Sequence, residues 1–220
     1  MNNLETAVLS NFLCKTKEMP KLLLATTNQG KAREYRHLFK GLPFELVTPA
    51  EEGINITVEE NHPSYEENAR LKAIAYARAS QLITVADDSG VEVDALGGDP
   101  GIRSARAAGE NASDKHRVAH LLARLRDVPR EKRTARFKCV IAIATSAGET
   151  ELCHGECQGL IAFEPRGENG FGYDPVFYLS EFGKTMAELP MEIKNQVSHR
   201  GTAAREAYKI LERLAVRVKL

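Results

Sequence analysis

The chain has 220 residues, and its 30 Lys and Arg residues balance 30 Asp and Glu residues, so the formal net charge is zero. This balance argues against a protein that coats nucleic acid or an anionic membrane, although it allows a local basic pocket for a phosphorylated small molecule. With 43% hydrophobic and 27% charged residues, the composition is that of a folded globular protein. No apolar run approaches the ~20 residues of a membrane helix, so we expect no membrane association.

The beginning of the chain and its cysteines both favour a cytoplasmic protein. Residues 1–20, which end at Pro20, mix acidic, polar and basic side chains and lack the basic-then-apolar order of a secretory signal. We interpret them as an N-terminal extension of a single domain that occupies residues 21–220. In a chain of this length, four cysteines indicate reduced thiols more than a disulfide framework. They are Cys14, Cys139, Cys153 and Cys157.

The organised part of the chain starts with a βαβ pattern. A short apolar run at 21–26 predicts a buried strand, helical spacing predicts a helix over 31–40, and 44–47 predicts a second strand. Further along, capping residues and apolar runs between turn residues indicate more elements. The further helices are expected at 64–80, 114–127 and 202–216, and the further strands at 82–90, 91–98, 136–145 and 149–163. This mixed order predicts one α/β fold with two lobes.

The first segment with chemical content is TTNQGK at 26–31, between the first strand and the first helix. The free N–H groups and positive dipole end of a helix start favour a phosphate, and Lys31 adds a full charge. The segment is not a P-loop, because that motif needs Gly and Ser or Thr where this chain has Ala25 and Ala32. Phosphate binding and a plain capped helix with a surface lysine both stay open.

Two adjacent acids, Asp87 and Asp88, lie where the strand at 82–90 is expected to run into a glycine turn. Neighbouring carboxylates repel each other unless a cation or donors offset the charge, and Mg²⁺ favours carboxylate oxygens and bridges to phosphate. A remaining carboxylate could orient or deprotonate a water molecule. The alternative is a turn whose acids bind their own backbone.

Two more segments carry polar or aromatic groups that a cleft could use. On the helix at 64–80, Asn68 and Lys72 share a face that points either into a cleft or into solvent. In FGYDP at 171–175, an aromatic follows one glycine and precedes another, so the backbone can approach a ligand and the ring can stack on a base. The alternative for this segment is a tight turn with a half-buried ring.

Basic residues stand out in two places. Lys194 and SHRG at 198–201 precede the last helix, where they could donate to an oxo group or a phosphate, or form ordinary surface charge beside a Ser cap. In the Gly-rich loop at 97–112, Arg103 and Arg106 fit an anchoring role through ion pairs as well as they fit a functional one.

These motifs, in this order, resemble the inosine/xanthosine triphosphate pyrophosphatases, a family that clears aberrant purine nucleotides. The resemblance extends over about residues 21–216. Its fragments are TTNQGK (26–31), ENARLKA (67–73), ADDSG (86–90), LGGDPGIRSAR (96–106), FGYDP (171–175) and SHRG (198–201). It implies a long mixed β-sheet with flanking helices forming two lobes around a central nucleotide cleft, usually in a homodimer. It also implies Mg²⁺-dependent hydrolysis of ITP, dITP or XTP to the monophosphate and pyrophosphate.

The resemblance further implies roles for individual residues. Asp88 corresponds to the catalytic carboxylate. The implied metal ligands are Glu60, Asp87 and Asp88, with Glu59 a rival for Glu60. The implied substrate ligands are Thr26, Thr27, Asn28, Gln29, Gly30, Lys31, Lys72, Ser89, Phe171, Gly172, Tyr173, Asp174, Lys194, His199 and Arg200.

A donor-lined pocket would account for the implied choice of base. Inosine and xanthine carry an oxo acceptor at position 6, where adenine carries an amino donor. His199, Arg200 or backbone N–H groups would satisfy the oxo group but oppose adenine's amino group, a mismatch that can discriminate by several powers of ten. A nucleotide sensor without hydrolysis is the alternative. The adjacent acids favour the enzyme, because a mere binder of a polyanion gains little from them.

Overall fold

The computed structural model describes residues 19–218. Cys14 and residues 1–18 of the predicted extension therefore lie outside the described residues. The described part folds around one sheet of seven strands in the order β2-β1-β3-β4-β5-β6-β7. Strands β2, β1 and β3 are parallel, and every pairing from β3 to β7 is antiparallel. The strands are β1 (Lys21–Leu24), β2 (Glu45–Val47), β3 (Ile83–Val93), β4 (Thr134–Ala144), β5 (Thr150–Ile161), β6 (Phe177–Leu179) and β7 (Lys184–Thr185). The predicted mixed sheet is confirmed.

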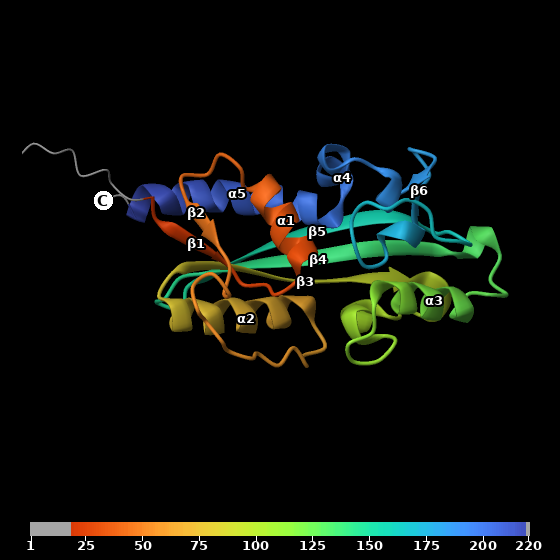
Figure 1. The fold of residues 1–220 in the computed structure, drawn as a ribbon, viewed down its shortest axis with the longest axis horizontal. Coiled ribbons are helices and arrows are strands. Elements are labelled where there is room, and N and C mark those ends of the chain that lie inside the picture. Colours follow the sequence, from red (N-terminus) through yellow and green to blue (C-terminus); the bar gives the residue numbers. More distant parts are fainter. Residues whose placement is uncertain (1–18, 219–220) are drawn as a thin grey trace, which may run out of the picture.

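Helices cover both faces of this sheet (Figure 1). Helices α1, α4 and α5 lie over one face, and α2 and α3 lie over the other. The α-helices are α1 (Gln29–Leu38), α2 (Tyr65–Ser80), α3 (Asp114–Arg124), α4 (Met191–Val197) and α5 (His199–Val218). Short 3₁₀ turns connect them: η1 (Asp94–Leu96), η2 (Gly101–Arg106), η3 (Arg130–Lys132), η4 (Asp174–Val176) and η5 (Met186–Glu188). None of the helices in residues 19–218 is long and apolar enough to cross a membrane.

The buried apolar side chains form clusters on both faces of the sheet. Under α1 and α5, Leu22, Tyr35 and Ile141 belong to one cluster. Under α2, Leu23 and Ala142 belong to another, as the alternation of side chains along a strand requires. A further cluster joins the far ends of β3, β4 and β5 to α3 and the β6 region. The sheet therefore has a helix-covered core at both ends of its long central strands.

The largest difference from the predicted elements is in the middle of the sheet. The sequence predicts two short strands, 82–90 and 91–98, with a glycine turn between them, and this is wrong. Strand β3 runs without a break from Ile83 to Val93, because β4 pairs with it antiparallel over ten successive positions. Gly90 instead allows η2 to pack closely on β3, because a Cβ at this position would lie 2.1 Å from the carbonyl oxygen of Gly101. Asp87 and Asp88 are therefore mid-strand residues.

The last helix also begins earlier than predicted. We expected it at 202, but α5 starts at His199. Ser198 caps this start, since its hydroxyl accepts the N–H of Gly201 at 3.1 Å and its carbonyl accepts that of Thr202 at 2.9 Å. The SHRG motif is thus the first turn of a helix packed on the sheet.

Candidate active site

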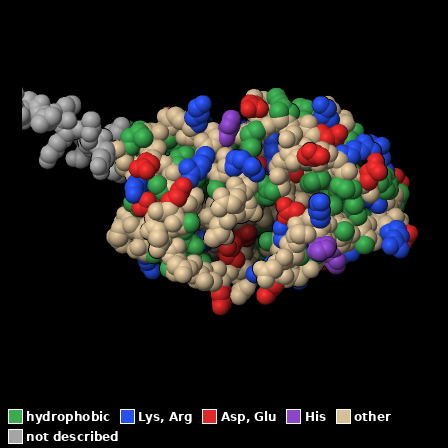
Figure 2. Space-filling model, in the orientation of Figure 1, with side chains coloured by type: hydrophobic (Ala, Val, Ile, Leu, Met, Phe, Trp, Pro, Cys, Tyr) green, Lys and Arg blue, Asp and Glu red, His purple; other side chains and the backbone are tan. Residues whose placement is uncertain are grey.

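A cleft of about 730 Å³ opens where the start of α1, the side of α2 and the η2–α3 region meet. Figure 2 shows a hollow near the middle of this face with acidic side chains inside it. Residues 88–91 of β3 line the cleft, as do residues 56–61 and 171–174. Segments far apart in the sequence therefore converge on one concave site.

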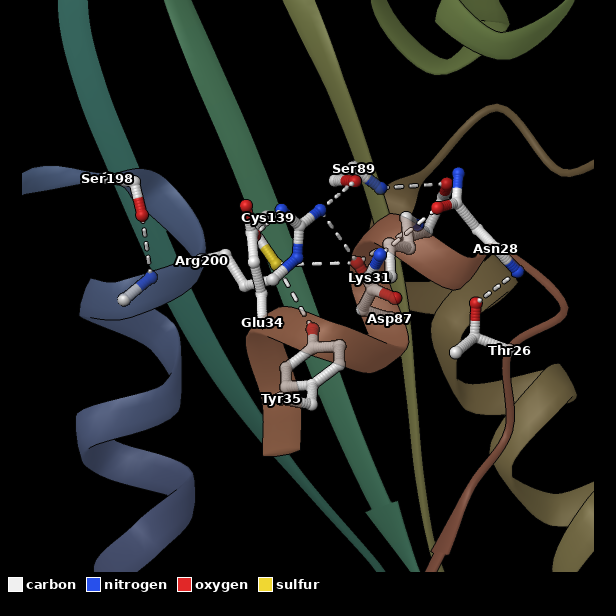
Figure 3. Close-up of polar contacts among 12 residues, drawn as sticks. Thr26, Asn28, Lys31, Glu34, Tyr35, Asp87, Ser89, Cys139, Ser198 and Arg200 are labelled. Atoms are coloured by element: carbon white, nitrogen blue, oxygen red, sulfur yellow. Dashed lines mark hydrogen bonds and ion pairs between the residues drawn. The ribbon is translucent and has the colours of Figure 1, made fainter. Parts of the chain in front are cut away.

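The start of α1 forms one wall of the cleft. The Asn28 side chain caps the helix by accepting the N–H of Lys31 at 3.1 Å, and the hydroxyl of Thr26 accepts the N–H of Asn28 at 3.1 Å. The Lys31 ammonium reaches Asp87 on β3 at 3.0 Å (Figure 3). The segment is therefore a rigid turn that presents hydroxyls, an amide and one ammonium group.

Neighbouring residues of β3 face opposite sides of the sheet. Asp88 lines the cleft and accepts a hydrogen bond from the Asn68 side chain at 3.0 Å. Burial raises the pKa of Asp88 despite that bond and despite Lys31 and Lys72. Asp87 is 1% exposed and does not line the cleft. Burial works to raise its pKa as well, but Lys31 and Arg200 outweigh burial and hold it below the ordinary value.

Helix α2 adds a cation and a carboxylate to the cleft beside Asp88. The Lys72 ammonium binds the Glu60 carboxylate at 2.9 Å, and both residues line the cleft. Burial works to lower the pKa of Lys72, but Glu60 and the two β3 acids raise it, so the ammonium stays charged. The alternative of a solvated helix face is wrong for Asn68 and Lys72, since both turn toward the cleft region.

The face of β3 opposite Asp88 holds a buried network of ion pairs. Glu34 of α1 forms an ion pair with Lys194 at 2.6 Å and accepts a hydrogen bond from Arg200 at 2.7 Å. Arg200 also reaches Asp87 at 3.4 Å and the Ser89 hydroxyl at 3.1 Å (Figure 3). The alternative of ordinary surface charge is therefore wrong for Lys194 and Arg200. Sequence reasoning missed Glu34, whose one signal is that it lies four residues after Gly30 on the buried side of α1.

The glycine-rich segment at 170–174 packs its aromatic ring on α1. A Cβ at Gly30 would lie 2.5 Å from the Phe171 ring, so this glycine makes room for the ring. The Lys194 ammonium and the Arg200 guanidinium lie 5.0 and 5.3 Å from the ring centroid. Asp174 holds the turn by accepting the N–H of Phe171 at 2.8 Å.

His199 lies on the same side of the cleft. Its ring stacks on Phe137 with centroids 4.5 Å apart. Burial, reinforced by Arg200 and Lys194, holds the pKa of His199 well below its ordinary value, so the ring is neutral. Among the described residues, its Nδ1 atom has no hydrogen-bond partner although the residue lines the cleft.

Most of the predicted site residues are brought together here. Those that line the cleft are Thr26, Thr27, Asn28, Lys31, Glu60, Lys72, Asp88, Ser89, Phe171, Gly172, Tyr173, Asp174, His199 and Arg200. Four others do not line it, namely Gln29, which is exposed, and Gly30, Asp87 and Lys194, which are buried. Glu59, the rival of Glu60, also lines the cleft but contacts Asn61 instead of Lys72.

The mixed sheet and this cleft, which charged and apolar side chains line together, define an α/β protein with a candidate small-molecule site beside its central strand. Residues 22–210 match the Ham1 family, and the chain belongs to that family. The family resemblance inferred from the motifs is confirmed.

Relatives and solved structures agree with this assignment over most of the chain. A dITP/XTP pyrophosphatase of Desulforamulus reducens is 48% identical over 89% of this chain and 98% of its own length. One of Bacillus subtilis is 42% identical over 88% of this chain and 98% of its own. The HAM1 protein structure from Coxiella burnetii superposes with a TM-score of 0.79 at 38% identity, over 88% of this chain and 98% of that one. The Staphylococcus aureus Ham1 protein gives 0.76 at 42%, over 87% and 98%.

Proposed function

We propose that this chain hydrolyses non-standard purine nucleoside triphosphates, dITP, XTP and ITP, to the monophosphate and pyrophosphate with Mg²⁺. Relatives named dITP/XTP pyrophosphatase that align over nearly their full length support the activity. The observation that carries the proposal is that Asp88 and the Lys72–Glu60 ion pair line the same cleft as His199 and Phe171.

The phosphate tail binds between the start of α1 and α2. Thr26, Thr27 and Asn28 offer hydroxyl and amide groups there, while Lys31 of α1 and Lys72 of α2 supply positive charge. Charge-assisted bonds to phosphate are stronger than neutral ones, and helix starts favour anions. The sugar and base then extend toward the 171–174 segment.

The donor set at the phosphate end suits Mg²⁺. Asp88 and Glu60 both line the cleft, and the charge of Glu60 contributes to the raised pKa of Asp88. A divalent cation would remove that repulsion. Mg²⁺ commonly binds one or two carboxylates together with substrate phosphates, so two acids are enough to hold it. Asp87 faces away from the cleft, so the proposed ligands are Asp88 and Glu60.

Asp88 acts as the base for the attacking water. Its carboxylate takes a proton from the water while the oxygen attacks phosphorus, and the bond to the pyrophosphate oxygen breaks. The hydrogen bond from Asn68 fixes the carboxylate, and Lys31 and Lys72 stabilise the negative charge that moves onto the leaving group. When bound, Mg²⁺ supplies further neutralisation of phosphate charge.

The other side of the cleft selects the base. Phe171 offers a flat ring for stacking. The Nδ1 atom of the neutral His199 has no partner among the described residues, and in its protonated tautomer it can donate a hydrogen bond to the oxo group of hypoxanthine or xanthine. Arg200 is 1% exposed and already donates to Glu34, Asp87 and Ser89, so it stabilises this wall.

A nucleotide screen that measures both pyrophosphate and orthophosphate tests the proposal. With Mg²⁺, we expect dITP, XTP and ITP to yield pyrophosphate far faster than ATP or GTP, and EDTA to stop the reaction. Release of orthophosphate, or equal turnover of ATP, would refute it. Calorimetric binding without turnover would instead favour a sensor. We further propose that the protein is cytoplasmic and forms a homodimer. Light scattering on the purified protein would measure its molar mass and so check the dimer.

A further inference from the structure

Arg106 is a cleft residue to which the proposed reaction assigns no role. It ends η2, it is exposed, and it lines the cleft. Its guanidinium donates to the backbone carbonyl of Glu60 at 3.0 Å and more weakly to the Asn61 side chain at 3.4 Å. It therefore spans from the η2 wall to the loop that carries Glu60.

The charge of Arg106 is unmatched, unlike that of its neighbours. Within residues 19–218, every other Lys or Arg that lines the cleft pairs with a carboxylate. The pairs are Lys31 with Asp87, Lys72 with Glu60, Arg117 with Asp114, and Arg200 with Glu34. In the described part of the chain, no carboxylate lies within 4.0 Å of the Arg106 guanidinium. A guanidinium has five donors, so several are free for an anion.

Arg106 lies at the phosphate end of the cleft. Its guanidinium contacts the carbonyl of Glu60, and the Lys72 ammonium contacts the carboxylate of the same residue. The two cations thus converge on one residue from two different elements, η2 and α2. A polyphosphate between them would meet positive charge on both sides.

The segment that presents Arg106 is held firmly on the sheet. The Ser104 hydroxyl accepts the N–H of Val91 at 2.9 Å and donates to the carbonyl of Gly101 at 2.6 Å. The Tyr173 hydroxyl donates to the Ser104 carbonyl at 3.0 Å. Because Gly90 lets η2 approach β3 closely, the turn is preorganised and only the Arg106 side chain has to move.

We propose that Arg106 binds the polyphosphate tail of the substrate, exchanging its carbonyl and amide partners for phosphate oxygens. Binding in this way makes two charge-assisted bonds in the fork geometry that suits phosphate. The inference rests on the proposed function, since it assigns a phosphate ligand within the same site. It also separates the two arginines that the sequence left open: Arg103 pairs with Asp99 at 2.7 Å outside the cleft.

Calorimetry with inorganic pyrophosphate and with inosine monophosphate tests this role without requiring turnover. Arg106→Gln should weaken pyrophosphate binding about 10- to 100-fold, the range for losing a charged hydrogen bond, and change monophosphate binding less than about threefold. The pyrophosphate affinity of Arg106→Lys should lie between those of the wild type and Arg106→Gln, because lysine keeps the positive charge but cannot make the two parallel hydrogen bonds of a guanidinium. Arg103→Gln is the matched control and should bind both ligands like the wild type.

Two results would overturn the inference. One is unchanged pyrophosphate binding by Arg106→Gln. The other is an equal loss for both ligands, which is what a purely structural anchor of the Glu60 loop would produce. Turnover of dITP by the wild type is measured separately. If it is absent while Arg106→Gln still loses pyrophosphate selectively, the proposed function fails and the phosphate role of Arg106 stands.

Discussion

Asp87 and Asp88 are adjacent residues of one strand, yet they lie in opposite surroundings. Asp87 belongs to a closed network in which Lys31 and Arg200 neutralise it and hold its pKa low. Asp88 lines the cleft, where burial raises its pKa; among residues 19–218, Asn68 supplies its one hydrogen bond from another side chain. The carboxylate of Asp87 is thus stabilised as an anion on one face of the sheet, while that of Asp88 lies in the cleft on the other face, where a ligand can reach it.

The difference teaches how this fold separates support from chemistry. The network behind the cleft ties α1, β3 and α5 together through Glu34, Asp87 and Arg200, and so fixes the walls. Removing one partner from this network should lower the stability of the fold, because the ion left behind stays buried and keeps its desolvation penalty. The face that contains Asp88 is left with few partners, as a site that must accept a ligand requires.

The strongest way to break the comparison is to make the same substitution at both positions. Asp87→Asn removes the buried counter-ion of Lys31 and leaves Arg200 with Glu34 as its remaining carboxylate partner, so it should lower the free energy of unfolding by about 3 kcal/mol. Asp88→Asn should change it by less than about 1 kcal/mol, since the fold does not favour the charged form there. Urea denaturation at neutral pH measures both. Equal losses would mean that the two faces are not different.

Activity should show the reverse order. Asp88→Asn removes the proposed base and should reduce turnover of dITP at least about a hundredfold while the circular dichroism spectrum is unchanged. A folded Asp88→Asn protein that turns over dITP at the wild-type rate would remove this role from Asp88.

A substitution that joins the two regions should have an intermediate effect. Gly30→Ala places a methyl group 2.5 Å from the Phe171 ring and should push the ring toward the cleft, at a cost of about 1–3 kcal/mol in stability. We expect a higher KM for dITP and weaker discrimination against dATP, measured by steady-state kinetics. Unchanged base selectivity would show that Phe171 does not shape the base site.

The smallest effect should be the pH dependence of stability, measured in EDTA between about pH 3 and about pH 7. Asp87, with its pKa below the ordinary 3.8, stabilises the fold above that value and loses this contribution as the pH falls below it. Asp88, with its pKa raised, costs stability as the pH rises above 3.8. Each unit of displacement is worth about 1.4 kcal/mol. Relative to wild type, Asp88→Asn should therefore gain stability with rising pH, and Asp87→Asn should lose it.

Local patterns in the sequence were sufficient for much of the fold. The sequence predicts the capped helix start after β1, the helix from Ser64 and the two strands β4 and β5, because each of these elements depends on neighbouring residues. The family and most of the residues that line the cleft were also within reach, since six short motifs keep their order along the chain.

What the sequence could not decide depended on contacts between distant segments. The unbroken β3 strand requires its pairing with β4, about fifty residues away, which outweighs the local turn preference of Asp-Ser-Gly. In the sequence, nothing distinguishes Glu34 from other acids on a helix. Its role depends on Lys194 and Arg200, which the fold brings to it from the other end of the chain. Whether an acid becomes a support or a reactive group is set by burial and by its partners, and both are properties of the packed structure alone.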